Sequence, residues 1–199
     1  MDSAVVVRQD RGGFFLDEPD YRGPYGSATF SEDGRYRYDL WRRIGGNAVY
    51  MKGQVAFVCL NPSTATERAN DATVWRLSRR AWNWGYEGVH VVNLFGLRSV
   101  DPKVLYRDLD PVGPENDRLL TEVCAAAALV VCAWGAHGTF QNRGDCVLEL
   151  LRRSCRSELY AFGLTKNRQP RHPLFLSMAT RPRPLSELMA PQPEERYDS

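Results

Sequence analysis

The sequence predicts an α/β protein of three layers, α/β/α, in which helices cover both faces of a four-stranded parallel sheet. Four short apolar runs alternate with segments whose apolar residues recur at helical spacing. Strands that alternate with helices are typical of parallel sheets, because each parallel connection needs a long crossover. A hairpin signal precedes the first of these runs, so an N-terminal β-hairpin is predicted as well.

The hairpin is predicted between residues 28 and 40. Two short strands flank Asp33-Gly34, a dipeptide that favours a tight hairpin turn. The alternation from Arg35 to Tyr38 places two tyrosines on one face and two arginines on the other. A charged, solvated edge strand is the commoner reason for such a pattern. The alternative is an arginine face that lies along a phosphate backbone.

The first strand of the sheet is predicted over residues 55–60, an apolar run typical of a strand buried on both faces. Pro62 ends it, because proline has no N–H for the ladder. Asn61, Ser63 and Thr64 therefore follow the carboxyl end of a strand, where open α/β sheets bind ligands. An ordinary turn explains Asn-Pro-Ser equally well.

A helix is predicted next, with Asp71 as its N-cap and Gly85 as its C-terminal stop. Its apolar positions are Val74, Leu77 and Ala81. Its polar face carries Arg76, Arg79 and Arg80. Such a stripe is usually solvated surface, and phosphate contact is the alternative. Asp71 is also a candidate general base, although a helix cap explains it without chemistry.

The remaining elements repeat this alternation. Strands are predicted over residues 88–93, 129–133 and 158–162, and helices from Pro114 to about Ala127 and from about Thr139 to Arg153. Residues 27–185 are predicted to form a single domain. Residues 1–26, rich in glycine and proline, predict an irregular N-terminal arm, and residues 186–199 predict a disordered tail.

Composition narrows the class of protein. The formal charge of +2 and the pI of about 8.3 permit a nucleic-acid partner without requiring one. The five cysteines include no CxxC pair and lie mainly among apolar residues, which predicts buried free thiols and no metal site. No apolar run approaches 18 residues and the N-terminus does not read as a signal peptide, so we expect a cytoplasmic protein without a membrane partner.

Four polar clusters follow the four predicted strands, and a parallel sheet brings such clusters to one rim. They are Asn61 to Thr64, Asn93 to Phe95, Trp134-Gly135 with His137, and Arg171 to Pro173. Motifs of the forms GxGxxG, GxxxxGK[ST], HExxH and GxSxG are missing from the sequence. Dinucleotide, nucleoside-triphosphate, zinc-protease and esterase chemistry are therefore not expected.

Individual residues of these clusters suggest base recognition. The Asn93 carboxamide offers one acceptor and two donors, enough for paired hydrogen bonds to the edge of a base. His172 can donate to an oxygen that gains negative charge, and Arg171 beside it favours the neutral imidazole. Phe95 can stack on a flat ligand, or lie in the core. His137 is a weaker candidate for a site residue than His172.

The sequence resembles a family of bacterial and phage proteins known as domain-of-unknown-function family 1643, over residues 35–184. The motifs that carry this resemblance are Leu60-Asn-Pro-Ser-Thr-Ala65, Asn70-Asp-Ala-Thr73, Val92-Asn-Leu-Phe95, Asp110-Pro-Val-Gly-Pro-Glu-Asn116, Trp134-Gly-Ala-His-Gly138, Gly163-Leu-Thr165 and His172-Pro-Leu174. The family name implies no reaction.

The chain also resembles, more distantly, the uracil-DNA glycosylases. Leu60-Asn-Pro-Ser63, Asn93, Trp134-Gly135 and His172-Pro173 occur in the order of that superfamily's motifs. This resemblance implies a glycosylase-like fold for residues 27–185. It implies that Asn61 positions a water molecule, that Asn93 reads the base, and that His172 donates to the base oxygen in the transition state.

The predicted function is that of a nucleic-acid or nucleotide enzyme that holds a flipped base at this rim and acts at or near its glycosidic bond. DNA or a nucleotide is the expected partner, with no metal and no cofactor. One alternative is a transferase that adds a group to a modified pyrimidine in DNA. The other is a non-catalytic nucleic-acid-binding module. The sequence leaves the identity of the base, the strandedness and the oligomeric state open.

Overall fold

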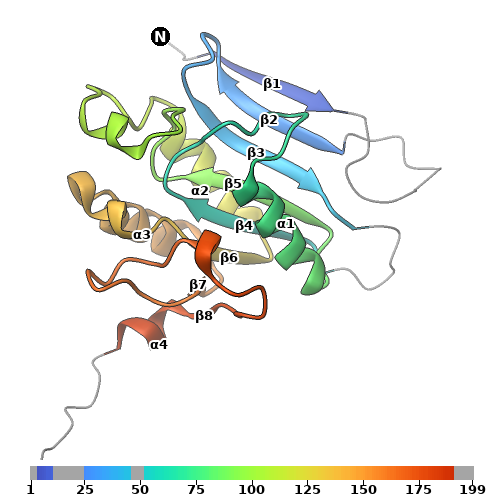
Figure 1. Cartoon of the computed structure of the whole chain (residues 1–199), viewed down its shortest axis with the longest axis vertical. Coiled ribbons are helices and arrows are strands. Elements are labelled where there is room, and N and C mark those ends of the chain that lie inside the picture. Colours follow the sequence, from blue (N-terminus) through green and yellow to red (C-terminus); the bar gives the residue numbers. More distant parts are fainter. Residues whose placement is uncertain (1–3, 11–24, 46–51, 191–199) are drawn as a thin grey trace, which may run out of the picture.

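The computed structural model describes residues 4–10, 25–45 and 52–190. In this part of the chain, eight strands form one mixed sheet in the order β1-β2-β3-β5-β4-β6-β7-β8 (Figure 1). The α/β class predicted from the sequence is confirmed. The sheet is larger than the four parallel strands predicted, because antiparallel strands extend it at both ends.

Four strands at the centre of the sheet carry the site. They are β4 (Gln54–Cys59), β5 (Gly88–Asn93), β6 (Leu129–Cys132) and β7 (Leu159–Ala161). β4 lies between β5 and β6 and pairs parallel with both, and β7 pairs parallel with β6. Because these strands run in one direction, their carboxyl ends lie at the same edge of the sheet.

The predicted hairpin is present, but it is an interior part of the sheet. β2 (Gly26–Ser31) and β3 (Arg37–Arg43) pair antiparallel, with Gly34 in the turn at a φ of 71°. β3 also pairs with β5, so both of its edges are occupied. Arg37 is consequently buried, with 2% of its surface exposed. The interpretation of this segment as a charged, solvated edge is therefore wrong.

β1 (Val5–Asp10) adds an outer strand by pairing antiparallel with β2. It lies within residues 1–26, for which the sequence predicts an irregular arm. Three consecutive valines begin this strand, and β-branched side chains favour the extended conformation. Residues 1–3 and 11–24 of the arm lie outside the described residues.

Four α-helices and three short 3₁₀ helices complete the described part of the fold. The α-helices are α1 (Ala72–Asn83), α2 (Asn116–Ala126), α3 (Arg143–Ser154) and α4 (Leu185–Met189). The 3₁₀ helices are η1 (Pro102–Tyr106), η2 (Ala136–Asn142) and η3 (Pro173–Phe175). None of the helices described is both long and apolar enough to cross a membrane.

The C-terminal part of the chain adds β8 and α4 at one end of the sheet (Figure 1). β8 (Arg183–Pro184) pairs antiparallel with β7, and α4 follows directly. α4 extends into residues 186–199, for which the sequence predicts disorder. Its Leu185 is buried in the core, which gives this turn of helix a packed anchor. Residues 191–199 lie outside the described residues.

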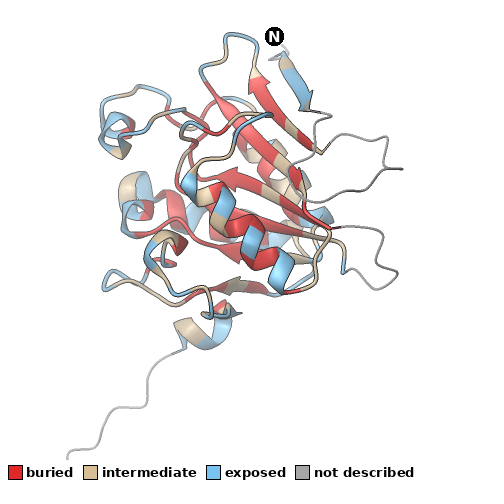
Figure 2. Ribbon diagram, turned by 45° about the vertical axis from the view of Figure 1, so that its right-hand side comes forward, coloured by how far each residue is buried: buried red, intermediate tan, exposed pale blue. Residues whose placement is uncertain are grey.

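Two apolar clusters lie on opposite faces of the sheet. Val58 of β4 packs in one cluster with Leu120 of α2 and Leu151 of α3. Its neighbour Phe57 packs in the other cluster with Leu77 of α1. Successive side chains of a strand point to opposite faces, so β4 must be apolar throughout to be buried on both. Figure 2 shows these central strands as buried.

α1 begins where the sequence predicts. Asp71 is its N-cap, and its Oδ1 atom accepts a hydrogen bond from the Val74 backbone N–H at 2.8 Å. The helix ends before Gly85, whose φ of 83° lies in the left-handed region that glycine tolerates best. The cap fixes the Asp71 carboxylate at the start of the helix, next to the carboxyl end of β4.

Buried polar side chains hold the backbone that follows β5. Asn116 Nδ2 donates to the carbonyl oxygens of Asn93, at 3.0 Å, and Leu94, at 3.1 Å. Arg143 Nε donates to the same Leu94 oxygen at 2.9 Å. These bonds satisfy carbonyls that leave the ladder at the end of the strand. They also fix the position from which the Asn93 side chain projects.

Candidate functional site

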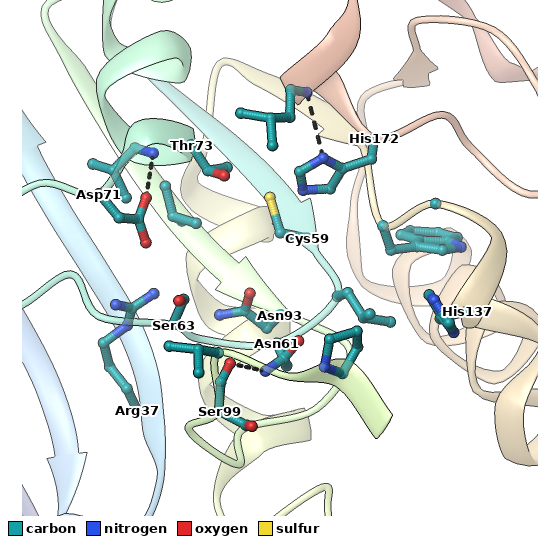
Figure 3. A pocket seen from close by; sticks show the side chains of 18 of the residues that line it. Arg37, Cys59, Asn61, Ser63, Asp71, Thr73, Asn93, Ser99, His137 and His172 are labelled. Carbon is teal, nitrogen blue, oxygen red and sulfur yellow. Dashed lines mark hydrogen bonds between the residues drawn. The ribbon is translucent and has the colours of Figure 1, made fainter. Parts of the chain in front are cut away.

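A cavity of about 510 Å³ opens at the carboxyl ends of the central strands. Cys59 of β4 and Asn93 of β5 line it, with Trp134 after β6. Asp71 at the start of α1 and His172 after β7 are among its other polar residues (Figure 3). A volume of this size is typical of sites for small molecules and cofactors. Segments far apart in the chain thus meet at one rim.

The structure brings together most of the residues that the sequence predicts for a site. The predicted residues that line the cavity are Asn61, Ser63, Asp71, Asn93, Trp134, His137 and His172. The predicted residues that do not line it are Pro62, Thr64, Phe95 and Arg171.

The four residues outside the cavity have other surroundings. Pro62 is buried, and its carbonyl oxygen accepts a hydrogen bond from Ser99 N–H at 2.9 Å. Thr64 is exposed. Phe95 is fully buried in the core against Phe140 and is not available for stacking on a ligand. Arg171 is exposed, and its Nε atom donates to the Leu164 carbonyl oxygen at 3.1 Å.

Asn93 is the most unusual polar residue of the cavity. Only 1% of its surface is exposed, and neither its Oδ1 nor its Nδ2 atom has a hydrogen-bond partner among the described residues. A buried polar group without a partner costs about 1 to 3 kcal/mol. Such a carboxamide, facing a cavity, can form one acceptor and two donor hydrogen bonds to a ligand.

His172 presents a ring nitrogen to the cavity. It is the N-cap of η3, and its Nδ1 atom accepts a hydrogen bond from Leu174 N–H at 3.3 Å. An accepting Nδ1 places the proton of the neutral ring on Nε2, which faces the cavity in Figure 3. Burial lowers the pKa of His172 below its usual 6.5. The ring is therefore a neutral hydrogen-bond donor at neutral pH.

Gly135 allows the loop after β6 to approach His172. Its φ of 78° is in the left-handed region, and its N–H donates to the Pro170 carbonyl oxygen at 2.8 Å. A Cβ atom at this position would lie 3.3 Å from His172 Cβ. The glycine of the Trp-Gly pair thus lets two loops pack closely around the cavity.

The Asn61 carboxamide has a fixed orientation. Its Nδ2 atom donates to the carbonyl oxygens of Ser99, at 2.8 Å, and Pro62, at 3.1 Å. Both donor hydrogens are therefore used, and Oδ1 is left as the available acceptor. A carbonyl oxygen held in this way can accept a hydrogen bond from a water molecule and orient it.

Trp134 and His137 form one wall of the site. The Trp134 Nε1 atom donates to Gln169 Oε1 at 2.7 Å inside the protein. Gly138 lies so close that a Cβ atom there would be 2.2 Å from Trp134 Cδ1. His137 is exposed at the rim, where its Nδ1 atom contacts the Tyr106 hydroxyl. The tryptophan thus anchors the wall, and the histidine contacts solvent.

Sequence reasoning did not identify Arg37 as a site residue. It projects from β3 into the cavity, and its Nη1 atom donates to the Ala65 carbonyl oxygen at 2.6 Å. Its Nε atom has no partner in the part of the chain described. Burial lowers the pKa of Arg37 to about 10, so it remains a cation at neutral pH. Cys59, Thr73, Ser99, Val100 and Phe175 also line the cavity without having been predicted.

Exposed apolar side chains lie at the rim of the cavity, and two arginines of the α1 stripe do not face it. Val100 is 74% exposed and Phe175 is 90% exposed. Arg76 donates to the Leu176 carbonyl oxygen at 2.7 Å. Arg80 is buried and donates to backbone carbonyls between residues 176 and 180. These two arginines hold the segment after η3, which leaves them unsuited to phosphate contact.

Cys59 is expected to react slowly with a thiol reagent in the native protein, because burial raises the pKa of its thiol to about 12. Cys146 is exposed and should be labelled first. Mass spectrometry of labelled peptides, with a Cys146→Ser variant as control, separates the two sites. Rapid labelling of Cys59 would contradict this expectation and would indicate an accessible thiolate in the cavity.

Comparison with protein families gives one match. A family model described as "Protein of unknown function (DUF1643)" matches residues 37–174. Comparisons with curated proteins and with solved structures gave no match. The matched region begins at Arg37 and ends at Leu174, so it includes every residue that lines the cavity except Phe175.

Proposed function

The chain belongs to the DUF1643 family of proteins of unknown function, and we propose that it is a nucleic-acid or nucleotide enzyme that binds a base in the cavity. The enzyme acts at or near the glycosidic bond of that base. Asn93 is the observation that carries this proposal. Its buried carboxamide lacks partners among the described residues, and a base edge supplies both an acceptor and a donor to such a group.

The other polar residues of the cavity fit the steps of glycosidic-bond hydrolysis. Asn61 Oδ1 orients a water molecule, because both Nδ2 hydrogens are occupied by backbone carbonyls. Cleavage of the bond leaves negative charge on the departing base, and His172 Nε2–H donates to the base oxygen that carries it. The oriented water attacks the sugar carbon, and its proton leaves to solvent. Asn61 and His172 thereby have different roles in one step.

The order of the motifs supports the same proposal. The strand-end asparagines, the Trp-Gly pair and the His-Pro pair follow the order of the uracil-DNA glycosylase motifs. On this proposal the fold is similar to that superfamily, with the hairpin strands added beyond β5. Ligand binding outside the carboxyl ends of parallel strands is the general rule for open α/β sheets.

A group transferase acting on a modified pyrimidine is the second candidate. Arg37 and Asp71 favour it, because the hydrolytic step described above uses neither of these charged residues. A thiolate mechanism is not part of this candidate, since burial raises the pKa of Cys59 to about 12. A transferase would still need Asn93 to hold the base.

The test of the proposed function is a panel of oligonucleotides and nucleosides that carry different modified bases, analysed by mass spectrometry. Loss of a base identifies a glycosylase, and gain of mass in the presence of a donor identifies a transferase. Binding without a mass change identifies the non-catalytic module. If no base-containing compound binds, the proposed function is wrong.

The dependence of affinity on salt concentration tests whether the substrate is a nucleic acid or a free nucleoside. Arg98 and Arg171 are exposed, and each adjoins a residue that lines the cavity. If they contact phosphates of single-stranded DNA, the log–log slope of affinity against salt should become shallower by about 1.4 when both are changed to alanine. Arg153→Ala on α3 is the control. Salt-independent binding would instead indicate a free nucleoside as the substrate.

A further inference from the structure

Arg37 and Asp71 bring opposite charges to the same cavity from different elements. Arg37 belongs to β3, and Asp71 caps α1. Figure 3 shows the guanidinium and the carboxylate on the same side of the cavity. Within residues 4–10, 25–45 and 52–190, no ion pair within 4.0 Å joins them to each other or to another charged side chain. Both charges are therefore available to a ligand that lies between them.

The guanidinium is buried with its hydrogen bonds incomplete. Its Nη1 atom donates to the Ala65 carbonyl oxygen, while its Nε atom has no hydrogen-bond partner in the described part of the chain. Only 2% of the residue is exposed. Burying a charge without full compensation is costly, so a ligand acceptor at this position would gain a strong hydrogen bond.

The Asp71 carboxylate has unused acceptor capacity. Its Oδ1 atom accepts from Val74 N–H at 2.8 Å, as a helix cap does. An ionised carboxylate has about four lone-pair sites, of which the cap uses one. Asp71 can therefore accept from a ligand donor without loss of the cap. The two residues together offer a donor and an acceptor at separate positions in one cavity.

We propose that Arg37 and Asp71 bind a neutral, dipolar substituent of the base, whose acceptor faces Arg37 and whose donor faces Asp71. A hydroxyl group is the simplest substituent of this kind. The inference rests on the proposed function, because Asn93 must hold the ring that carries the substituent. An anionic substituent would be attracted by Arg37 and repelled by Asp71. A cationic substituent would be repelled by Arg37 and attracted by Asp71.

Four deoxyuridines with different groups at carbon 5 test this selectivity by calorimetry at pH 7.5. The groups are methyl, hydroxymethyl, carboxyl and aminomethyl. The hydroxymethyl nucleoside should bind the wild-type protein about 10-fold more tightly than the methyl one, as expected for hydrogen bonds to charged groups. The carboxyl and aminomethyl nucleosides should gain less affinity relative to the methyl nucleoside. Equal affinity for all four would overturn the proposal.

Removing one charge at a time makes the test sharper. Asp71→Asn retains an N-cap side chain, because asparagine caps helices as well as aspartate does. It should strengthen binding of the carboxyl nucleoside about 10-fold and weaken binding of the aminomethyl one. Arg37→Gln should have the opposite effect on the two nucleosides. A uniform change in affinity across all four nucleosides in either variant would mean that Arg37 and Asp71 do not interact with the substituent.

The stability of the ligand-free protein separates this inference from the proposed function. If no nucleoside binds, the proposed function fails, and a double-mutant cycle of melting temperatures still decides the role of the two charges. Asp71 stabilises the Arg37 cation through space without contacting it, so some coupling between Arg37→Gln and Asp71→Asn is expected. A double variant that melts lower than either single variant supports charges with a further role, whereas one that melts no lower than the less stable single variant would show that each charge only compensates the other, which overturns the inference.

Discussion

Replacing His172 by alanine is expected to lower the rate of the chemical step about 100-fold, while substrate binding changes little. The reason is the direction of its hydrogen bonds. Nδ1 accepts from Leu174 N–H, so Nε2 is the donor that faces the cavity. A donor aimed at charge that develops on the base stabilises the transition state more than the bound substrate. Single-turnover rates and dissociation constants, measured separately, distinguish the two effects.

The pH dependence of this rate has a definite sign. Burial lowers the pKa of His172 below 6.5, and the neutral ring is the form that keeps the Leu174 bond. The His172 contribution is therefore complete above pH 6.5 and is lost as the pH falls through the lowered pKa. The same group also stabilises the fold above pH 6.5 and ceases to do so in acid. The acid limb of the rate should disappear in the alanine variant.

Two variants control this experiment. His172→Gln retains an N–H donor and should recover part of the rate. His90→Gln changes a histidine outside the cavity, in β5, where His90 Nδ1 lies 3.0 Å from Asp39. It should leave both the rate and its acid limb unchanged. An alanine variant of His172 that binds weakly but reacts at the wild-type rate would contradict the role proposed for this residue.

The central strands could be predicted because their signal is local. A continuous apolar run that stops at Asn61-Pro62 predicts a buried strand and its end, and β4 ends at Cys59. The partners of β3 could not be predicted in the same way. Its alternation of arginine and tyrosine fits an edge strand, and only the pairing with β5, far along the chain, makes it interior. The sequence pattern predicts which side chains share a face of a strand, but the pairing of that strand with others decides whether the face is buried.

The same distinction explains the site. Asn93 was predictable, because a polar residue that ends a buried strand lies at the ligand-binding edge. Phe95, two residues later, turns into the core against Phe140. Arg80 belongs to a helix face that the sequence marks as polar, but its acceptors are carbonyls 96 to 100 residues away. Arg37 likewise donates to the carbonyl oxygen of Ala65, 28 residues further along the chain. Buried arginines depend on such distant carbonyls, which no local pattern shows.

Replacing Asn93 by alanine is expected to weaken binding of the base by about 1 to 3 kcal/mol, or roughly 5- to 150-fold. The fold should be retained. The Asn93 side chain has no hydrogen-bond partner among the described residues, so its removal breaks no hydrogen bond there and relieves an unsatisfied buried amide. The melting temperature of the ligand-free variant should therefore equal or exceed that of the wild type.

Asn116→Ala is the matched control for this prediction, because Asn116 is an equally buried asparagine whose Nδ2 atom is bonded to the Asn93 and Leu94 carbonyls. It should lower the melting temperature, since the Asn93 carbonyl loses this donor and the Leu94 carbonyl keeps only its bond from Arg143. Calorimetric binding and thermal unfolding of both variants give the comparison. If Asn93→Ala instead unfolds the protein as Asn116→Ala does, or binds every base as the wild type does, then Asn93 is a structural residue and the cavity does not recognise a base through it.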